Sequence, residues 1–164
     1  MTDRSLEDMT TFHLERFVPY LVHSIGSRLA EGFGECFDAA GVNLQEWRVM
    51  AVLHEFGPQT MGDIARRTSI NASTMTRLIG AMEKSALVER ERPVANQRTV
   101  YVRLRDEGRR KVERLIPQVI DYERDLSACF SEAELDTFRT LLSKMFRSLT
   151  DDRPPAEREK ILAG

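Results

Sequence analysis

Hydrophobic residues recur along most of this chain at the spacing of amphipathic helices. In the clearest stretch, Met75, Leu78, Ile79 and Met82 follow the order i, i+3, i+4, i+7, which places one apolar stripe along a helix. Asn71 precedes the stripe and suits the N-cap, because its side chain accepts from free backbone N–H groups. The periodicity predicts helices over 19–40, from 43 to the Gly57–Pro58 turn, over 60–67 and 71–84, after a cap at Asp106 with a bend or interruption at Pro117, and from 131 to 149.

The pattern changes to strand-like alternation after residue 86. Residues 87–92 and 99–104 are predicted strands, and in the second Val100, Val102 and Leu104 alternate with polar or aromatic residues. The loop between them, PVANQR, contains a proline and an asparagine that can turn the chain. The order helix, turn, helix, turn, helix, hairpin is that of a helix-turn-helix followed by a wing. We therefore expect a mainly α fold with a small β-hairpin wing.

The face of the 71–84 helix opposite its apolar stripe carries polar and cationic residues. Hydroxyl groups crowd its first turns, where recognition helices usually contact DNA, and short donors and cations can reach base edges and phosphates in a major groove. The alternative is a solvated helix of an ordinary bundle. The outward residues are Ser73, Thr76, Arg77, Gly80 and Lys84, and Thr74 completes the hydroxyl cluster.

Positive charge is concentrated in this same segment. The whole chain has a net charge of −2, which by itself argues against a nucleic-acid partner. Residues 60–105, however, carry nine Arg or Lys and four Asp or Glu, a local balance of +5, against −5 for 1–59 and −2 for 106–164. A basic hairpin beside a recognition helix can lie along a phosphate backbone or enter the minor groove. The charge distribution favours double-stranded DNA as the partner.

The helices outside this segment have more apolar surface than one small domain can cover. Self-association would cover it, and a twofold dimer is the commonest closed form. Such a dimer presents two recognition helices roughly 34–36 Å apart, the spacing of pseudo-palindromic half-sites. The predicted organisation is a helical dimerisation region over 1–42 and 106–149, a winged helix-turn-helix over 43–105, and a flexible tail over 150–164.

Composition indicates a globular chain, with 41% hydrophobic and 30% charged residues. No apolar run approaches a membrane span and the N-terminus does not resemble a signal peptide, so we expect a cytoplasmic protein without a membrane partner. Cys36 and Cys129 make no disulfide framework. We expect no cofactor and no metal site at His13, His23 or His54, and no catalytic set that would indicate an enzyme.

Three motifs, taken in order, resemble one family. LQEWRVMAVL, TMGDIARRTSINASTMTRLIGAMEKSALVER and NQRTVYVRL, followed by a long helix, are similar to the MarR family of dimeric winged-helix transcription regulators, over roughly residues 19–149. The resemblance implies a cytoplasmic repressor, less often an activator, whose DNA binding responds to a small, often phenolic or aromatic carboxylate ligand. It places Ser73, Thr74, Thr76 and Arg77 in the major groove and Arg98 in the minor groove.

The chain departs from the family pattern at two positions. Asn96 stands where the family usually has an acidic residue that orients the wing arginine, and Ala86 stands where a glycine usually precedes the wing. The first departure concerns how Arg98 is held, and the second concerns the local turn geometry.

The resemblance also places an effector pocket beside the first long helix. His23 and Ser27 put polar groups on one face of that helix, and Trp47 could form an aromatic wall, although a core role for Trp47 is the main alternative. An aromatic acid or its coenzyme A thioester is the expected ligand. Two further alternatives are a redox sensor acting through Cys36 and a winged-helix protein-interaction module that does not bind DNA.

Overall fold

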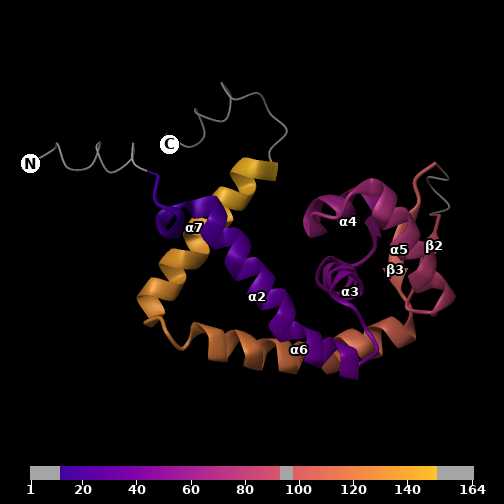
Figure 1. Ribbon diagram of the computed structural model, residues 1–164. Coiled ribbons are helices and arrows are strands. Elements are labelled where there is room, and N and C mark those ends of the chain that lie inside the picture. The colour runs from indigo at the N-terminus through magenta and orange to yellow at the C-terminus, as the bar shows by residue number, and fades with distance from the viewer. Residues whose placement is uncertain (1–11, 93–97, 151–164) are drawn as a thin grey trace, which may run out of the picture.

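The computed structural model describes residues 12–92 and 98–150, and the fold is mainly helical, as predicted. Three long helices, α2 (Val18–Ala39), α6 (Asp106–Ser127) and α7 (Glu132–Thr150), frame one side of the molecule (Figure 1). A compact unit of α3 (Leu44–Phe56), α4 (Met61–Thr68), α5 (Ala72–Lys84) and a small sheet occupies the other side. A short 3-10 turn, η1 (Leu14–Arg16), precedes α2.

The sheet has three antiparallel strands in the order β1-β3-β2, one more than the predicted hairpin. Strands β2 (Val88–Glu91) and β3 (Tyr101–Leu104) are shorter than predicted, and the loop residues 93–97 lie outside the described part of the chain. The additional strand β1 (Gln59–Thr60) pairs with Val102 and Tyr101 of β3. The sequence did not indicate β1 because two residues are too few to show an alternating pattern.

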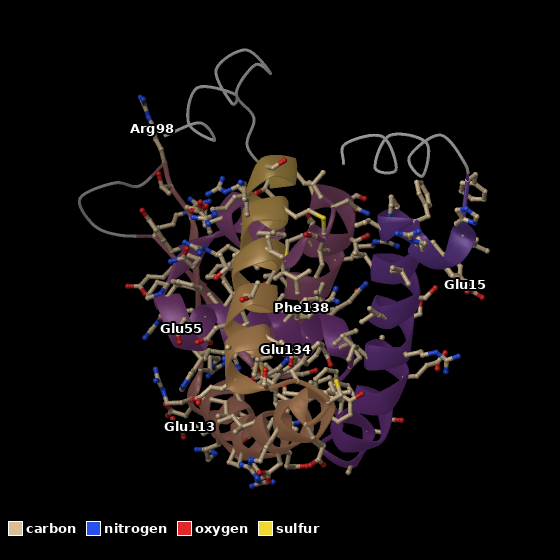
Figure 2. The ribbon with its side chains drawn as sticks, turned by 90° about the vertical axis from the view of Figure 1, so that its left-hand side faces the viewer. Glu15, Glu55, Arg98, Glu113, Glu134 and Phe138 are labelled. Carbon is tan, nitrogen blue, oxygen red and sulfur yellow. The ribbon has the colours of Figure 1, made fainter. Side chains whose placement is uncertain are left out.

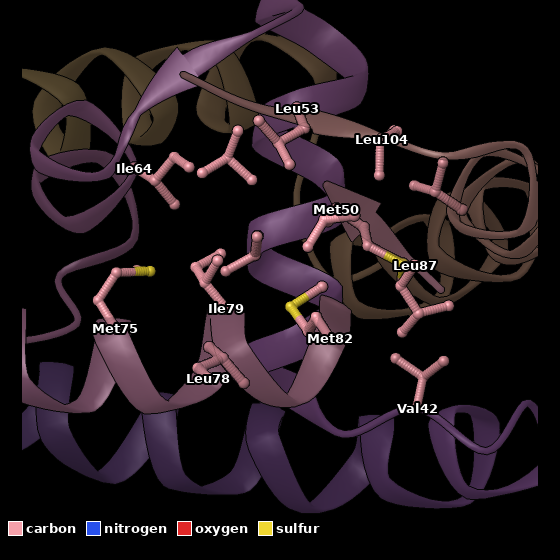
Figure 3. Close-up of a cluster of buried hydrophobic side chains, with 14 of the residues drawn as sticks. Val42, Met50, Leu53, Ile64, Met75, Leu78, Ile79, Met82, Leu87 and Leu104 are labelled. Atoms are coloured by element: carbon pink, nitrogen blue, oxygen red, sulfur yellow. The ribbon is translucent and has the colours of Figure 1, made fainter. Parts of the chain in front are cut away.

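The predicted apolar stripe of α5 faces the core. Met75, Ile79 and Met82 are fully buried, and Leu78 is 9% exposed. Figure 3 shows these side chains meeting Met50 of α3 and others from the sheet and α4. Burying such side chains is the main stabilising contribution to this unit.

The helix boundaries follow the capping signals of the sequence, and α6 differs from the prediction at Asp106 and at Pro117. Asn43 and Ser131 each stand three residues before a glutamate, which is the spacing of a capping box, and both capping boxes form. Asp106 does not cap α6: it is the first helical residue, and Arg105 at the N-cap makes no side-chain cap. Helix α6 also continues through Pro117 without interruption. Val112 and Leu115, in the turns before Pro117, are buried in the core, and such tertiary packing can stabilise the helix despite the missing N–H donor of the proline.

Helices α2 and α5 end in the same motif with different residues. After α2, Val42 N–H donates to Phe37 O and Gly41 N–H to Asp38 O; after α5, Leu87 and Ala86 donate to the equivalent carbonyls. This Schellman motif places Gly41 (φ 62°) and Ala86 (φ 56°) in the left-handed region. Ala86, which stands where the family usually has glycine, therefore keeps the geometry of the turn. Glycine would adopt this left-handed conformation with less strain than alanine does.

We expect Ala86→Gly to raise the free energy of unfolding by about 1 kcal/mol, because it relieves the left-handed strain of a residue with a Cβ atom. Gly41→Ala should lower it by a similar amount for the converse reason. Urea denaturation of both variants at one protein concentration checks the pair. A lower stability for Ala86→Gly would contradict the assigned strain.

Candidate nucleic-acid interface

Side chains of the first turns of α5 are arranged by its N-cap. Asn71 Oδ1 accepts from the backbone N–H of Thr74 at 2.9 Å and from the Ser73 hydroxyl at 2.9 Å. The Thr76 hydroxyl donates to Ala72 O at 3.0 Å. These donated hydrogen bonds orient the hydroxyls of Ser73 and Thr76. Both residues are exposed, and their hydroxyl oxygens can still accept hydrogen bonds from a partner.

The predicted recognition face is exposed along the length of α5. Ser73, Thr76, Arg77 and Lys84 are exposed, while Thr74 is half-buried at the first turn. Because the opposite stripe is buried, this face is held at the surface of a rigid unit. The structure thus brings five of the six predicted DNA-contacting residues together on one helix, with Thr74 at the edge of the set.

The preceding helix α4 is also capped at its N-terminus by hydrogen-bonded polar side chains. The Thr60 side chain accepts from Asp63 N–H at 3.1 Å, and its hydroxyl donates to the Asp63 carboxylate at 2.6 Å. That hydroxyl and the neighbouring Arg66 guanidinium hold the pKa of Asp63 below its ordinary value. Because folding favours the charged carboxylate, Asp63 makes a small contribution to the free energy of unfolding at neutral pH. This contribution is lost in acid as Asp63 protonates.

Three arginines on the two strands of the wing are paired with acids of the protein. Arg103 contacts Glu89 and Glu91, and Arg105 contacts Glu89 at 3.5 Å. Arg90 pairs with Glu83 of α5. The stem of the wing is therefore charge-compensated.

Arg92 and Arg98 lie on either side of the wing tip, and both are exposed. Figure 2 shows Arg98 extending away from the body of the molecule. This placement suits a contact with the minor groove beside the major groove that α5 would occupy. Asn96 lies outside the described residues, so the prediction about its effect on Arg98 stays a prediction.

The three predicted ligand residues do not form one site within the chain. Trp47 of α3 is half-buried and stacks on Phe37 near the end of α2, with ring centroids 5.6 Å apart. Ser27 and His23 lie ten and fourteen residues before Phe37 on the same helix, which separates them from it by about 15 and 21 Å at 1.5 Å per residue. Both are exposed. Trp47 therefore belongs to a different place from His23 and Ser27.

Trp47 instead lines an open groove of about 390 Å³ between α3 and the end of α4. Two arginines contribute to it, and Arg67 also stacks over the Phe56 ring at 3.9 Å. The sequence did not indicate Arg67 because it is twenty residues from Trp47 and only the fold brings the two to one groove. The groove residues are Trp47, Arg48, Ala51, Val52, Arg67, Thr68 and Ser69.

The described residues were also compared with the expectations about metal ligands, cysteines and membrane-spanning helices. Residues 12–92 and 98–150 hold no group of three metal-binding side chains. Cys129 is an exposed thiol after α6, and the Cys36 side chain lies outside the described part, so redox sensing stays an untested hypothesis. Over the described ranges, no helix is both long and apolar enough to span a membrane.

Comparisons with known proteins agree with this architecture. The model of the MarR family matches residues 42–100. The HTH-type transcriptional regulator YsmB of Bacillus subtilis (strain 168), itself uncharacterised, is 34% identical over 93 residues, covering 57% of this chain and 64% of YsmB. This chain thus spans slightly under two thirds of that relative.

Two solved structures share the fold. NadR in complex with 4-hydroxyphenylacetate has a TM-score of 0.75 at 22% identity, covering 84% of this chain and 97% of NadR. A mutant of MarR from E. coli complexed with operator DNA has a TM-score of 0.70 at 19% identity, covering 78% and 92%. The observed order of the helices and of the two wing strands is the order predicted from the sequence. The chain thus has the winged helix-turn-helix fold of these solved structures, and its residues 42–100 match the MarR family.

Proposed function

We propose that this protein is a repressor that binds pseudo-palindromic double-stranded DNA in the cytoplasm as a homodimer and is released by a small aromatic acid. The observation that carries the proposal is the exposed face of α5, where Ser73, Thr76, Arg77 and Lys84 stand over a fully buried stripe with the wing beside them. Hydroxyls and an arginine on such a face can contact base edges and phosphates. The DNA-bound MarR neighbour supports this choice of partner.

The second half of the proposal is the dimer, formed by the helical regions 1–42 and 106–149. Helix α7 has 19 residues and buries none of them, although apolar side chains recur along it. The start of α2 is equally exposed, for example at Val18, Val22 and Ile25. Exposed apolar surface of this extent is typical of a protein interface, and a second copy carries the same surface.

The groove beside Trp47 is the proposed effector site. Its indole ring can stack on an aromatic ligand, and Arg48 and Arg67 can pair with a carboxylate. NadR, which shares the fold, was crystallised with 4-hydroxyphenylacetate, a ligand of this chemical class. His23 and Ser27 on α2 remain proposed contacts for a larger ligand such as a coenzyme A thioester, or for a site completed by the second subunit.

The proposed function is tested by selecting bound sequences from a pool of randomised duplexes and titrating the selected duplex with salt. We expect a steep fall in affinity as salt rises, because bound phosphates release counterions. Arg77→Ala should weaken specific binding by about 1–3 kcal/mol. 4-Hydroxyphenylacetate and related acids are then screened for release. Recovery of no preferred duplex by the wild-type protein would indicate an interaction module instead.

A further inference from the structure

Glu83, in the last turn of the recognition helix, contacts the wing in two ways. Its Oε1 accepts from the backbone N–H of Arg90 at 3.2 Å, and its Oε2 accepts from Arg90 Nη1 at 2.5 Å. The two side chains are 28% and 36% exposed, so the pair is partly shielded from water. One carboxylate of α5 thus holds both the main chain and the side chain of β2.

The backbone N–H of Arg90 has no strand partner in the sheet. Strand β2 is an edge of the sheet, because the order is β1-β3-β2. Arg90 is aligned with Val102 of β3, yet its N–H donates to Glu83 on the side away from β3. An edge strand presents such groups to solvent unless something covers them. Glu83 covers this one and joins the edge to α5.

The chain between the two elements is short and tightly bonded. Only Ser85, Ala86 and Leu87 separate α5 from β2, and Leu87 N–H donates back to Met82 O at 2.9 Å. Leu87 O then accepts from Arg105 N–H at 3.0 Å. The root of the wing is fixed by these bonds, and the Glu83–Arg90 contact adds a second attachment farther along β2.

We propose that Glu83 is a positioning residue that sets the angle between the recognition helix and the wing, so that α5 and the wing tip engage neighbouring grooves of one DNA site together. This inference rests on the proposed DNA-binding function. It assigns Glu83 a role opposite to that expected from its charge, since an acid close to DNA ordinarily weakens binding by repelling phosphate. Arg90 serves as the partner in this contact and is not required to touch DNA.

The test compares three variants on the selected duplex. Glu83→Ala removes both contacts, Glu83→Gln keeps an oxygen that can accept from the Arg90 N–H, and Glu91→Ala is the matched control. Glu91→Ala likewise removes one negative charge, but Glu91 lies in β2 and pairs with Arg103 inside the wing at 3.0 Å. Urea denaturation of each variant separates any change in folding from a change in binding.

We expect Glu83→Ala to bind about tenfold more weakly, the loss of one charge-assisted hydrogen bond. Hydroxyl-radical footprints should lose protection in the minor groove flanks while keeping it at the major-groove half-sites, a change that reduced folding alone would not produce. Glu83→Gln should retain flank protection. Glu91→Ala should bind as tightly as the wild type or more tightly, with its footprint unchanged.

Amide hydrogen exchange provides a readout without DNA. The Arg90 N–H should be protected in the wild type and in Glu83→Gln, and should exchange rapidly in Glu83→Ala. Unchanged affinity and flank protection in Glu83→Ala would overturn the inference while leaving the proposed function in place. A wild-type protein that binds no duplex would overturn the proposed function, and amide exchange would then still decide whether Glu83 holds the wing.

Discussion

Gly108→Ala is expected to lower the free energy of unfolding by about 3 kcal/mol, the upper part of the range for overpacking a core. A Cβ atom at Gly108 would lie 2.1 Å from Leu87 O and 3.1 Å from Leu104 Cδ2. The first neighbour is main chain, and Leu87 O already accepts from Arg105 N–H, so it cannot move without weakening that bond. The substitution should therefore separate α6 from the root of the wing.

Gly80→Ala is the matched control, because Gly80 is also a helical glycine but has nothing within 4 Å of its would-be Cβ. Alanine there should stabilise the protein by about 1 kcal/mol through helix propensity. Urea denaturation of both variants measures the contrast. A Gly108→Ala variant as stable as the wild type would contradict the close approach of α6 to Leu87.

Leu141→Glu is expected to convert the proposed dimer into a monomer and to weaken binding to the selected duplex about 100-fold or more. This factor is the avidity lost when two half-sites are no longer bound by linked subunits. Leu141 is 59% exposed, so its replacement should leave the folding of one protomer almost unchanged. In a twofold interface, however, each substitution places two unpaired carboxylates among apolar side chains, at several kcal/mol per ion.

The control for this experiment is Thr140→Glu, an exposed position on the polar side of α7, away from the apolar stripe, that gains the same charge. Sedimentation velocity over a range of protein concentrations measures assembly, and the selected duplex measures binding. We expect Thr140→Glu to remain dimeric. A Leu141→Glu variant that sediments as the wild type does would show that α7 is not part of the interface.

The resemblance to the MarR family and the local elements were predictable from the sequence because they depend on neighbours within a few residues. Asn43 and Ser131 cap their helices through glutamates three positions later, and both capping boxes form as the spacing indicates. The stripe beginning at Met75 is buried for the same reason: a helical repeat fixes which side chains share a face, whatever the helix packs against. The opposite face of α5 could therefore be identified in advance.

Contacts between residues distant in sequence were decided only by the tertiary structure. Trp47 lines a groove together with Arg67, which the sequence did not indicate, and lies far from His23 and Ser27, with which it was predicted to bind a ligand. Counting charges in residues 60–105 overestimated the basic surface of the wing, because Arg103 and Arg105 are paired with acids across the sheet. Composition gives the number of charges in a segment, whereas strand register decides which of them neutralise one another.

The sequence by itself determined the helical repeat, the helix caps and the exposed polar face of α5, since each depends on the periodicity of a single element. Only the tertiary structure decided that β1 joins the sheet, that Gly108 leaves room for Leu87, and that Glu83 reaches Arg90. These three features depend on how one element approaches another. That approach is set by the packing of the whole core, which no short stretch of sequence encodes.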